Sequence, residues 1–381
     1  MAKGVYIGVG GKARKVKKMY AGIGGRARKV KKAYVGVNGV ARLFFSSGEL
    51  SYYVTVAGLS VARSGLAAAA VGDYALFGGG TGVYNNLGPV VDVYQKSLVK
   101  STSVSLLEER RSLAAATVGN YALFANGTKT NCHWTVEAFN ASLVRSNAPI
   151  SSAPVHTLAG VSAGNYALFG GGYDGPHSKY SAAVTAYNAS LVKSTPTELT
   201  ATRSDLAAAA VGEYALFGGG GGGSLGKTDY AAVDAYNASL VRSTPAELTA
   251  ARSNLAAASV GEYALFGGGG DISVSSDVNY AVVDAYNASL VRSTPAGLSA
   301  ARHGLAAATV GEYAVFCGGD NDIDYSAVAD AYNASLVRSA PAALSAARYD
   351  MASVTIGNYA LFGGGYGADG RSAAVDVYQV D

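Results

Sequence analysis

A repeated unit of 45 to 50 residues constrains this sequence more than any other feature. The string Tyr-Ala-Leu-Phe occurs six times and Tyr-Ala-Val-Phe once, and a second aromatic residue follows each copy. The copies begin at Tyr74, Tyr121, Tyr166, Tyr214, Tyr263, Tyr313 and Tyr359. Self-similarity of this length is typical of repeat architectures in which each copy forms one structural unit.

Each unit divides into four short segments. In the copy from Ala250 to Leu298, segment A (LAAASV) and segment B (YALFG) are separated by Gly-Glu, a tight-turn signal. Segment C (AVVDAYN) follows a variable loop, and segment D (SLVRS) follows a second turn. Segments this short fit strands and not helices. We therefore predict an all-β fold, a seven-bladed β-propeller over residues 49–381.

The alanine-rich segment A conflicts with this prediction, because Leu-Ala-Ala-Ala-Ala has a high helix propensity. The space between Arg-Ser and the following Gly is too short for a stable helix. We expect segment A to line the central channel, where the blades converge and small side chains fit. The copies are Leu66–Val71, Leu113–Val118, Leu158–Ala163, Leu206–Val211, Leu255–Val260, Leu305–Val310 and Met351–Ile356.

The two ends of the repeat region predict how the ring closes. The sequence stops at Tyr378-Gln-Val-Asp, just after the seventh segment C and without a segment D. An alternating apolar stretch, Tyr52–Val56, precedes the first segment A. We expect Tyr52–Val56 to pair beside the C-terminal strand, which would remove open sheet edges.

The overall composition agrees with a turn-rich β protein, with 49% hydrophobic residues and 50 Gly in 381 residues. No apolar run approaches the roughly 18 residues of a membrane span, and the first residues lack the apolar region of a secretory leader. Cys132 and Cys317 form neither a disulfide framework nor a metal motif. We expect free thiols, no metal and no cofactor.

The repeat unit resembles a kelch repeat. The shared features are an apolar strand that ends in a glycine doublet (Gly267-Gly268), a later Tyr (Tyr286), and a turn that leads to a closing strand. Kelch repeats usually place Trp in the closing strand, where this sequence has Leu290 and Val291. The resemblance implies a divergent kelch-like propeller closed by an N-terminal strand.

Residues 1–48 form a second and different repeat. They carry 12 Lys/Arg and no acidic residue, whereas residues 49–381 carry 18 Lys/Arg and 26 Asp/Glu, a net charge of −8. Tyr6, Tyr20 and Tyr34 recur every 14 residues, each before a Gly-Gly or Asn-Gly turn. This pattern predicts three β-hairpins. The units resemble repeats at the N-termini of tail-associated proteins of phages and prophages, which implies attachment to a virion.

We expect the basic residues of the hairpins to dock to a particle or to another anionic partner. An anionic protein or cell-wall surface, nucleic acid and solvated charge stay as alternatives; we disfavour nucleic acid because no base-reading motif is present. Hairpins this poor in apolar residues need a partner or oligomerisation, so a homo-oligomer stays open. The docking candidates are Lys12, Arg14, Lys15, Lys17, Lys18, Arg26, Arg28, Lys29, Lys31 and Lys32.

The loops between segments B and C differ among the seven copies, while the strands are nearly identical. In a four-stranded blade these loops share one face, so they could form a composite binding surface for a glycan or protein. Tolerant turns that drift in sequence are the alternative. The ligand-binding candidates are Tyr84, Asn86, His133, Trp134, Tyr173, Asp174, His177, Asp271, Asp322, Asp324, Tyr366 and Asp369.

Three other patterns have simpler interpretations. Asp320–Asp324 starts like a calcium loop but lacks its Gly and closing Glu, which favours a solvated acidic turn. Asn-Ala-Ser recurs at the C–D turn, where turn chemistry explains it better than glycosylation. A recurrent Arg precedes segment A and predicts a repeated blade-linking hydrogen bond or, alternatively, a ligand contact; the third copy has Val155 there, so the bond should be missing. The arginines are Arg63, Arg203, Arg252, Arg302 and Arg348.

These observations lead us to expect a non-enzymatic tail or baseplate protein of a phage or prophage, located in the virion. Its hairpins would contact other tail proteins, and its propeller loops would contact a host-surface glycan or protein. A bacterial cytoplasmic kelch-like adaptor is the first alternative. A glycan-active propeller enzyme is the second, but no nucleophile–base pair or phosphate-binding loop is evident.

Overall fold

The computed structural model describes residues 6–9, 12–15, 19–23, 26–30, 32–37, 40–46, 48–82, 88–101, 104–129, 131–223, 228–271 and 278–380. Residues 6–46 are described as backbone strands only. All regular elements in these ranges are β-strands. No helix of the described chain is long and apolar enough to cross a membrane.

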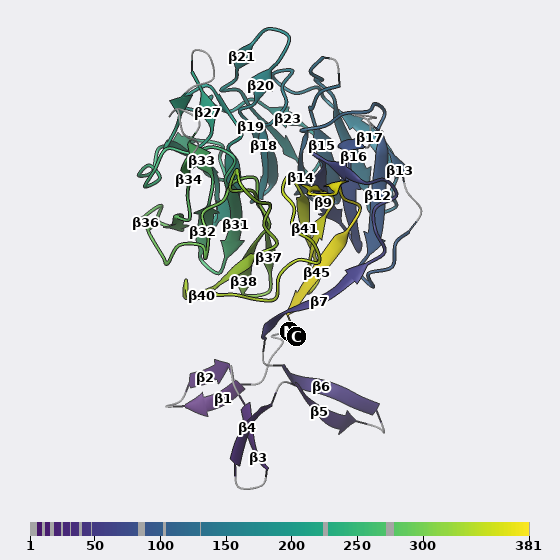
Figure 1. Cartoon of the computed structure of the whole chain (residues 1–381), viewed down its shortest axis with the longest axis vertical. Coiled ribbons are helices and arrows are strands. Elements are labelled where there is room, and N and C mark those ends of the chain that lie inside the picture. The colour runs from purple at the N-terminus through teal and green to yellow at the C-terminus, as the bar shows by residue number, and fades with distance from the viewer. Residues whose placement is uncertain are drawn as a thin grey trace.

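The described part of the repeat region contains seven four-stranded antiparallel sheets and several smaller sheets of two or three short strands. In each of the seven, the strands follow one another along the chain from the inner to the outer edge, except that the outermost strand of the last sheet comes from the N-terminal side. This all-β arrangement fits a β-propeller (Figure 1). The first four sheets are β9 (Ala67–Val71), β10 (Tyr74–Gly78), β12 (Val90–Gln95), β13 (Val104–Ser105); β14 (Ala114–Val118), β15 (Tyr121–Ala125), β16 (Val136–Asn140), β17 (Arg145–Ala148); β18 (Ala159–Ala163), β19 (Tyr166–Gly170), β22 (Val184–Asn188), β23 (Lys193–Ser194); and β25 (Ala207–Val211), β26 (Tyr214–Gly218), β29 (Val233–Tyr236), β30 (Arg242–Ser243). The other three are β31 (Ala256–Val260), β32 (Tyr263–Gly267), β35 (Val283–Asn287), β36 (Arg292–Ser293); β37 (Ala306–Val310), β38 (Tyr313–Cys317), β39 (Ala329–Asn333), β40 (Arg338–Ser339); and β41 (Ala352–Ile356), β42 (Tyr359–Gly363), β45 (Val375–Val380), β7 (Leu50–Val56).

The alanine-rich segments form the innermost strands, each starting one residue after its predicted beginning. Neighbouring innermost strands contact one another in chain order, and β41 contacts β9. In β9, Ala67 and Ala69 are buried while Ala68 and Ala70 are half-buried. Ala68 and Ala70 line a hollow of about 210 Å³, and alanines of other innermost strands, such as Ala208 and Ala257, line one of about 230 Å³. The steric explanation for alanine in these strands therefore holds.

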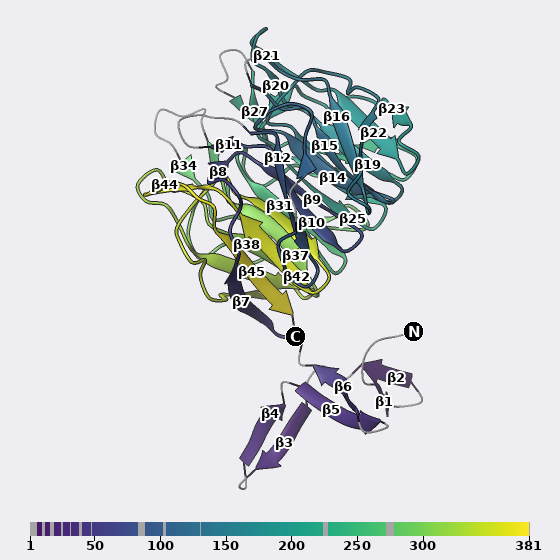
Figure 2. The same ribbon diagram turned by 90° about the vertical axis from the view of Figure 1, so that its right-hand side faces the viewer.

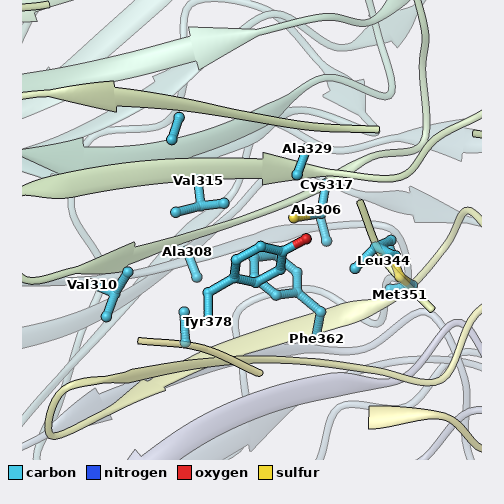
Figure 3. Packing of buried hydrophobic residues seen from close by; sticks show 12 residues of the cluster. Ala306, Ala308, Val310, Val315, Cys317, Ala329, Leu344, Met351, Phe362 and Tyr378 are labelled. Atoms are coloured by element: carbon cyan, nitrogen blue, oxygen red, sulfur yellow. The ribbon is translucent and has the colours of Figure 1, made fainter. Parts of the chain in front are cut away.

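Neighbouring sheets pack closely because glycine ends most of the second strands. A Cβ added at Gly363 would lie 2.8 Å from a ring carbon of Phe77 in the first sheet. Within each sheet the Phe meets the aromatic residue of the third strand edge to face; the Phe362–Tyr378 centroids lie 5.7 Å apart at 87° (Figure 3). The buried Tyr378 hydroxyl donates to the carbonyl of Ala342 at 2.7 Å.

The turn after the third strand corrects the predicted segment D. Asn287 Oδ1 accepts the N–H groups of Ser289 and Val291, each at 3.0 Å, which wraps the chain into a turn. Leu290 then adopts φ +60° and packs its side chain against the core. The outer strand starts only at Arg292, and its equivalents are two residues long in most sheets. The recurrent Asn is thus a turn residue, as its position predicts.

The N-terminal strand β7 lies beside β45 in both views (Figures 1 and 2). Leu50 pairs with Val380 and Val56 with Val375, with a bulge between Val377 and Tyr378. The Tyr52 and Thr55 hydroxyls donate to Asp376 Oδ1 at 2.8 and 2.9 Å. The pairing predicted for Tyr52–Val56 is therefore present.

Three two-stranded hairpins precede β7, as the tyrosine spacing predicts. They are β1 (Tyr6–Val9) with β2 (Lys12–Lys15), β3 (Met19–Ile23) with β4 (Arg26–Val30), and β5 (Lys32–Val37) with β6 (Val40–Ser46). Each forms a separate sheet in the described part of the chain.

Candidate functional site

The loops between the second and third strands of the sheets form one face of the molecule, which we call the loop face. Main-chain pairing holds the start of each of these loops. In every unit the residue after the Arg position pairs with the residue after the glycine doublet. The pairs include His156–Tyr173, His303–Asp320 and Tyr349–Tyr366. The others are Arg111–Thr128 and Ser253–Gly270, with Ser64–Thr81 and Ser204–Gly221 in the strand pairs β8 (Arg63–Ser64) with β11 (Thr81–Gly82) and β24 (Arg203–Ser204) with β27 (Gly221–Gly222).

A main-chain hydrogen bond joins each sheet to the next on this face. The second glycine of each doublet, or Gly127 of Asn126-Gly127 in the second unit, donates its N–H to the carbonyl of the next unit's Arg position. The distances lie between 2.8 and 3.0 Å: Gly80 to Arg110, Gly127 to Val155, Gly172 to Arg203, Gly220 to Arg252, Gly269 to Arg302, Gly319 to Arg348 and Gly365 to Arg63. The main chain makes this link at Val155 as well, so the prediction that an Arg at this position makes the link, and that it would be missing at Val155, is wrong.

A ring of seven main-chain hydrogen bonds surrounds the mouth of the channel on this face. Each residue has a left-handed φ of 52° to 64° and donates its N–H to the equivalent residue of a neighbouring unit. The order is Gly65 to Asp350, Gly304, Asn254, Asp205, Thr157, Ser112 and back to Gly65. This ring was not predicted from the sequence, although its members all follow the Arg position by two residues.

Two aspartates of the ring have raised pKa values. Part of Asp350 is exposed, but its carboxyl group lies close to many protein atoms that exclude water. This desolvation, together with the charge of Asp205, raises the pKa of Asp350 to about 6. Burial likewise raises the pKa of Asp205, whose carboxylate accepts the Ser204 hydroxyl. Among the described residues no group of three His, Cys, Asp or Glu side chains could hold a metal ion.

The side chain of the recurrent Arg has a structural role inside its own sheet. Arg252 Nη2 lies 2.9 Å from Asp284 Oδ2, and both side chains are fully buried. Burial lowers the pKa of Arg252, against the charge of Asp284. Arg110, which the sequence analysis did not include, pairs likewise with Glu137 at 2.9 Å. The ion pairs at Arg63, Arg203, Arg302 and Arg348 follow the same pattern.

The predicted ligand residues of the second sheet, His133 and Trp134, have different surroundings. His133 Nδ1 lies 2.6 Å from Glu108 Oε2, and burial lowers the pKa of His133 against the opposing charge of Glu108. Trp134 is 45% exposed, with its carbonyl accepting the N–H of Ser151. Trp134 is therefore an accessible aromatic side chain.

The loop of the third sheet brings several predicted residues together. Tyr173 in β20 (Tyr173–Asp174) packs at 4.8 Å against Tyr180 in β21 (Lys179–Tyr180) and edge-on at 5.6 Å against His156. Asp174 Oδ2 lies 2.7 Å from Nδ1 of the exposed His177. Burial lowers the pKa of His156, and the charge of Arg111 adds to this.

The loops of the fifth and sixth sheets share a polar network. Asn279 in β34 (Val278–Asn279) donates to Asp322 Oδ2 at 2.6 Å and lies 2.8 Å from His303 Nδ1. The acidic turn is internally bonded, because Asp320 accepts the N–H of Asp322 and Asn321 accepts that of Asp324. Asp271 lies in β33 (Gly270–Asp271), the strand that pairs with β34.

Three tyrosines from the sixth and seventh sheets meet on the loop face. Tyr325 stacks on Tyr349 with centroids 5.6 Å apart and an interplanar angle of 8°. Tyr366 in β43 (Tyr366–Gly367) meets both edge-on. Arg371 in β44 (Gly370–Arg371) lies 5.9 Å from the Tyr366 ring, and the exposed Asp369 lies in the turn between the two strands.

The structure thus distributes the predicted ligand residues over several loop clusters. Tyr84 and Asn86 lie outside the described residues. Tyr349 was not predicted, because it lies before an innermost strand and not in a loop between second and third strands. The position after the recurrent Arg varies among the copies as Ser, Arg, His, Ser, Ser, His and Tyr. This variation is the sequence signal that indicates Tyr349 as a surface residue.

The basic candidates lie on or between the hairpin strands. Lys12, Arg14 and Lys15 belong to β2, Arg26, Arg28 and Lys29 to β4, and Lys32 to β5. Lys17, Lys18 and Lys31 lie outside the described residues.

Comparisons with known proteins identify the fold and no more. No family model matches the sequence, and no curated protein matches it. A solved structure titled "Structure of YjhT" superposes with a TM-score of 0.58 at 10% identity, covering 75% of this chain and 99% of that one. Its propeller-like fold supports the propeller interpretation. Because 713 chains of solved structures match, the likeness describes an architecture and not an activity.

Proposed function

We propose that this protein is a non-enzymatic structural and binding component of a phage or prophage tail or baseplate. In this proposal residues 1–48 dock to the particle or to other tail proteins, and the loop face of residues 49–381 contacts a host-surface glycan or protein. The protein would therefore be located in the virion.

The observation that carries the proposal is the point where the hairpin segment joins the sheets. Leu50, the first residue of β7, pairs with Val380 at the end of the third strand of its sheet. The equivalent position in the other sheets begins the turn on the face opposite the loop face. The basic segment is thus attached on the face opposite the variable loops, so docking through one and ligand contact through the other would not compete for the same surface.

We further propose that the scaffold is a closed, seven-bladed, kelch-like propeller. The ring of main-chain hydrogen bonds at the channel mouth supports seven blades, because it returns from Ser112 to Gly65. The contact between β41 and β9 supports closure. The glycine doublets and the third-strand Tyr support the kelch-like assignment, since both recur at equivalent positions of the sheets.

A bacterial kelch-like adaptor outside any virion is the second candidate. The same loop face supports it, since loops on a propeller bind proteins as readily as glycans. Neighbouring genes for tail, baseplate or lysis functions would favour the virion, and their absence would favour the adaptor.

Particle incorporation tests the proposal. Particles are assembled with the full chain or with a chain lacking residues 1–48, and purified particles are examined by immunoblotting and immunogold imaging. We expect the full chain in particles and the truncated chain outside them, with equal unfolding temperatures for both proteins. Equal incorporation of the two chains would disprove the docking role, and a full chain absent from every particle would favour the adaptor.

A further inference from the structure

The three tyrosines of the sixth and seventh sheets form an aromatic surface held by the main chain. We call Tyr325, Tyr349 and Tyr366 the tyrosine platform. The Tyr349 N–H donates to the Tyr366 carbonyl at 2.9 Å, and the Tyr366 N–H donates back at 2.8 Å. Tyr325 is bridged to Asp320 across the acidic turn. Because the backbone is fixed by these pairs, little conformational entropy is lost when a ligand binds.

The rings of the platform are accessible but supported. All three are half-buried, and they contact one another at centroid distances of 5.6 to 6.1 Å. An aromatic face carries a negative quadrupole, which attracts the weakly positive C–H groups on one face of a pyranose ring. Partly exposed, mutually packed rings therefore suit a sugar that lies flat on them.

Hydrogen-bonding groups lie next to the platform. The acidic turn that leads to Tyr325 carries Asp322, whose carboxylate is bonded to Asn279 at 2.6 Å. His303 Nδ1 lies 4.0 Å from Asp322 Oδ2. The backbone at Gly304 approaches Tyr349 so closely that an added Cβ would lie 3.1 Å from its ring. Carboxylate and amide oxygens in this position can accept hydrogen bonds from sugar hydroxyls.

The charge around the platform selects against anionic ligands. Asp322, Asp324 and Asp369 are exposed on the loops that carry Tyr325 and Tyr366, and Arg371 over Tyr366 is the cation next to them among the described residues. Burial raises the pKa of Tyr349, and the charges of Asp350 and Asp320 add to this, so both carboxylates act on the platform. A sulfated or phosphorylated glycan would meet like charge here.

The surroundings also favour a sugar over a protein. Protein interfaces have a contiguous apolar core of aromatic and aliphatic anchors. In the described part of the acidic turn, Ile323 is the large apolar side chain that is exposed, at 85%, and charged residues flank it. Polar groups that rim a small aromatic surface are the chemistry of saccharide recognition.

We propose that the tyrosine platform binds an uncharged saccharide, with the sugar ring stacked on Tyr325 or Tyr366 and its hydroxyls bonded to Asp322 and Asn279. This inference rests on the proposed function, since it specifies the ligand class of the loop face.

A glycan array tests the proposal with the full chain. The array carries uncharged hexose and N-acetylhexosamine oligosaccharides together with sulfated and phosphorylated forms of equal length. We expect binding to uncharged members only. The strongest array ligand is then titrated calorimetrically against Tyr366→Ala, Tyr325→Ala, Tyr366→Phe and the distant loop control Trp134→Ala.

We expect about tenfold weaker binding for both Ala variants of the platform, at unchanged unfolding temperature. Tyr366→Phe keeps the ring and should bind within about twofold of the unsubstituted protein, as should Trp134→Ala. Loss of binding in Trp134→Ala alone would overturn the platform while leaving the loop face as the binding surface. Binding to anionic glycans only, or to no glycan, would overturn the saccharide. Neither result depends on particle incorporation, which tests the proposed function separately.

Discussion

Gly365 donates its main-chain N–H to the carbonyl of Arg63 at 2.9 Å, which joins the last sheet of the chain to the segment before the first. The same bond connects each of the other sheets to its successor. Because one geometry serves both sequential and terminal neighbours, the last interface is equivalent to the others. The stability of every sheet should therefore depend on both chain ends.

Substitution of Gly363 by Ala should destabilise the protein through this last interface. The new methyl group would lie 2.8 Å from Phe77 in the first sheet, and overpacking of this kind costs about 1–3 kcal/mol. Gly88→Ala is the matched control, since its Cβ would meet side-chain and backbone atoms only at 3.8 Å and beyond. Chemical denaturation of both variants measures the difference; equal free energies of unfolding would contradict the close interface.

The buried pair Arg252–Asp284 can be replaced by its natural counterpart in the third sheet, where Val155 and Thr185 occupy the same positions. Thr185 Oγ1 accepts the N–H of Ser152 at 3.0 Å, as Asp284 accepts that of Thr249. Arg252→Val alone removes the closer arginine of the buried Asp284 carboxylate and leaves Arg292 Nη1 at 3.8 Å, so it should cost about 3 kcal/mol. Adding Asp284→Thr should restore part of that loss in equilibrium unfolding. A double variant no more stable than the single one would show that the pair is not coupled.

Asp350→Asn should stabilise the protein at neutral pH. The carboxyl group has a raised pKa of about 6 when folded, against 3.8 ordinarily, so folding favours its protonated form. The associated stability is complete below the ordinary value and is lost as the pH rises toward and through 6. Asn is neutral at every pH and tolerates the φ of +55°. The unfolding temperature of the variant should exceed that of the unsubstituted protein at pH 7.5 and match it at acid pH. A constant difference across this range would refute the raised pKa.

Two truncations separate the hairpins from the closing strand. A chain that starts at Glu49 retains β7 and should unfold cooperatively at an unchanged temperature. A chain that starts at Ala57 lacks β7, so the outer edge of β45 is exposed and Asp376 loses the hydroxyl groups of Tyr52 and Thr55, while it keeps Arg348. We expect this second chain to unfold at a markedly lower temperature or to aggregate, as monitored by circular dichroism. Equal stability of the two chains would mean that β7 is dispensable.

Much of the fold could be predicted from the sequence because each repeat is locally consistent. Segments A and B became strands within one residue of their predicted bounds, as at Ala256–Val260 and Tyr263–Gly267, and the strand of segment C begins two residues late, at Val283. Segment D was predicted too early, because Leu290 looks like a strand residue but adopts a left-handed turn that Asn287 holds. The apolar pattern cannot show that difference, since Leu290 is needed by the core in either conformation.

The candidate site could be predicted only in part. Tyr366 could be predicted because it lies in a loop whose sequence varies among the copies. Tyr349 could not, because it follows the recurrent Arg in a segment that resembles its equivalents in most copies. The main chain and the side chain of that Arg have two different roles, which the sequence did not predict. Its carbonyl links neighbouring sheets and its side chain is paired inside its own sheet, as at Arg348 and Asp376. Such a division depends on three-dimensional contacts that a single sequence does not contain.

A disulfide trap tests most directly the claim that the first and last strands close the scaffold. Leu50→Cys and Val380→Cys are introduced together in a Cys132→Ser background, because these two residues are paired across β7 and β45. Thiol titration and non-reducing electrophoresis after mild oxidation measure the outcome. The account predicts a quantitative intramolecular disulfide in the native protein and none after denaturation and dilution. Two thiols that stay fully reactive in the native protein would contradict the closed ring.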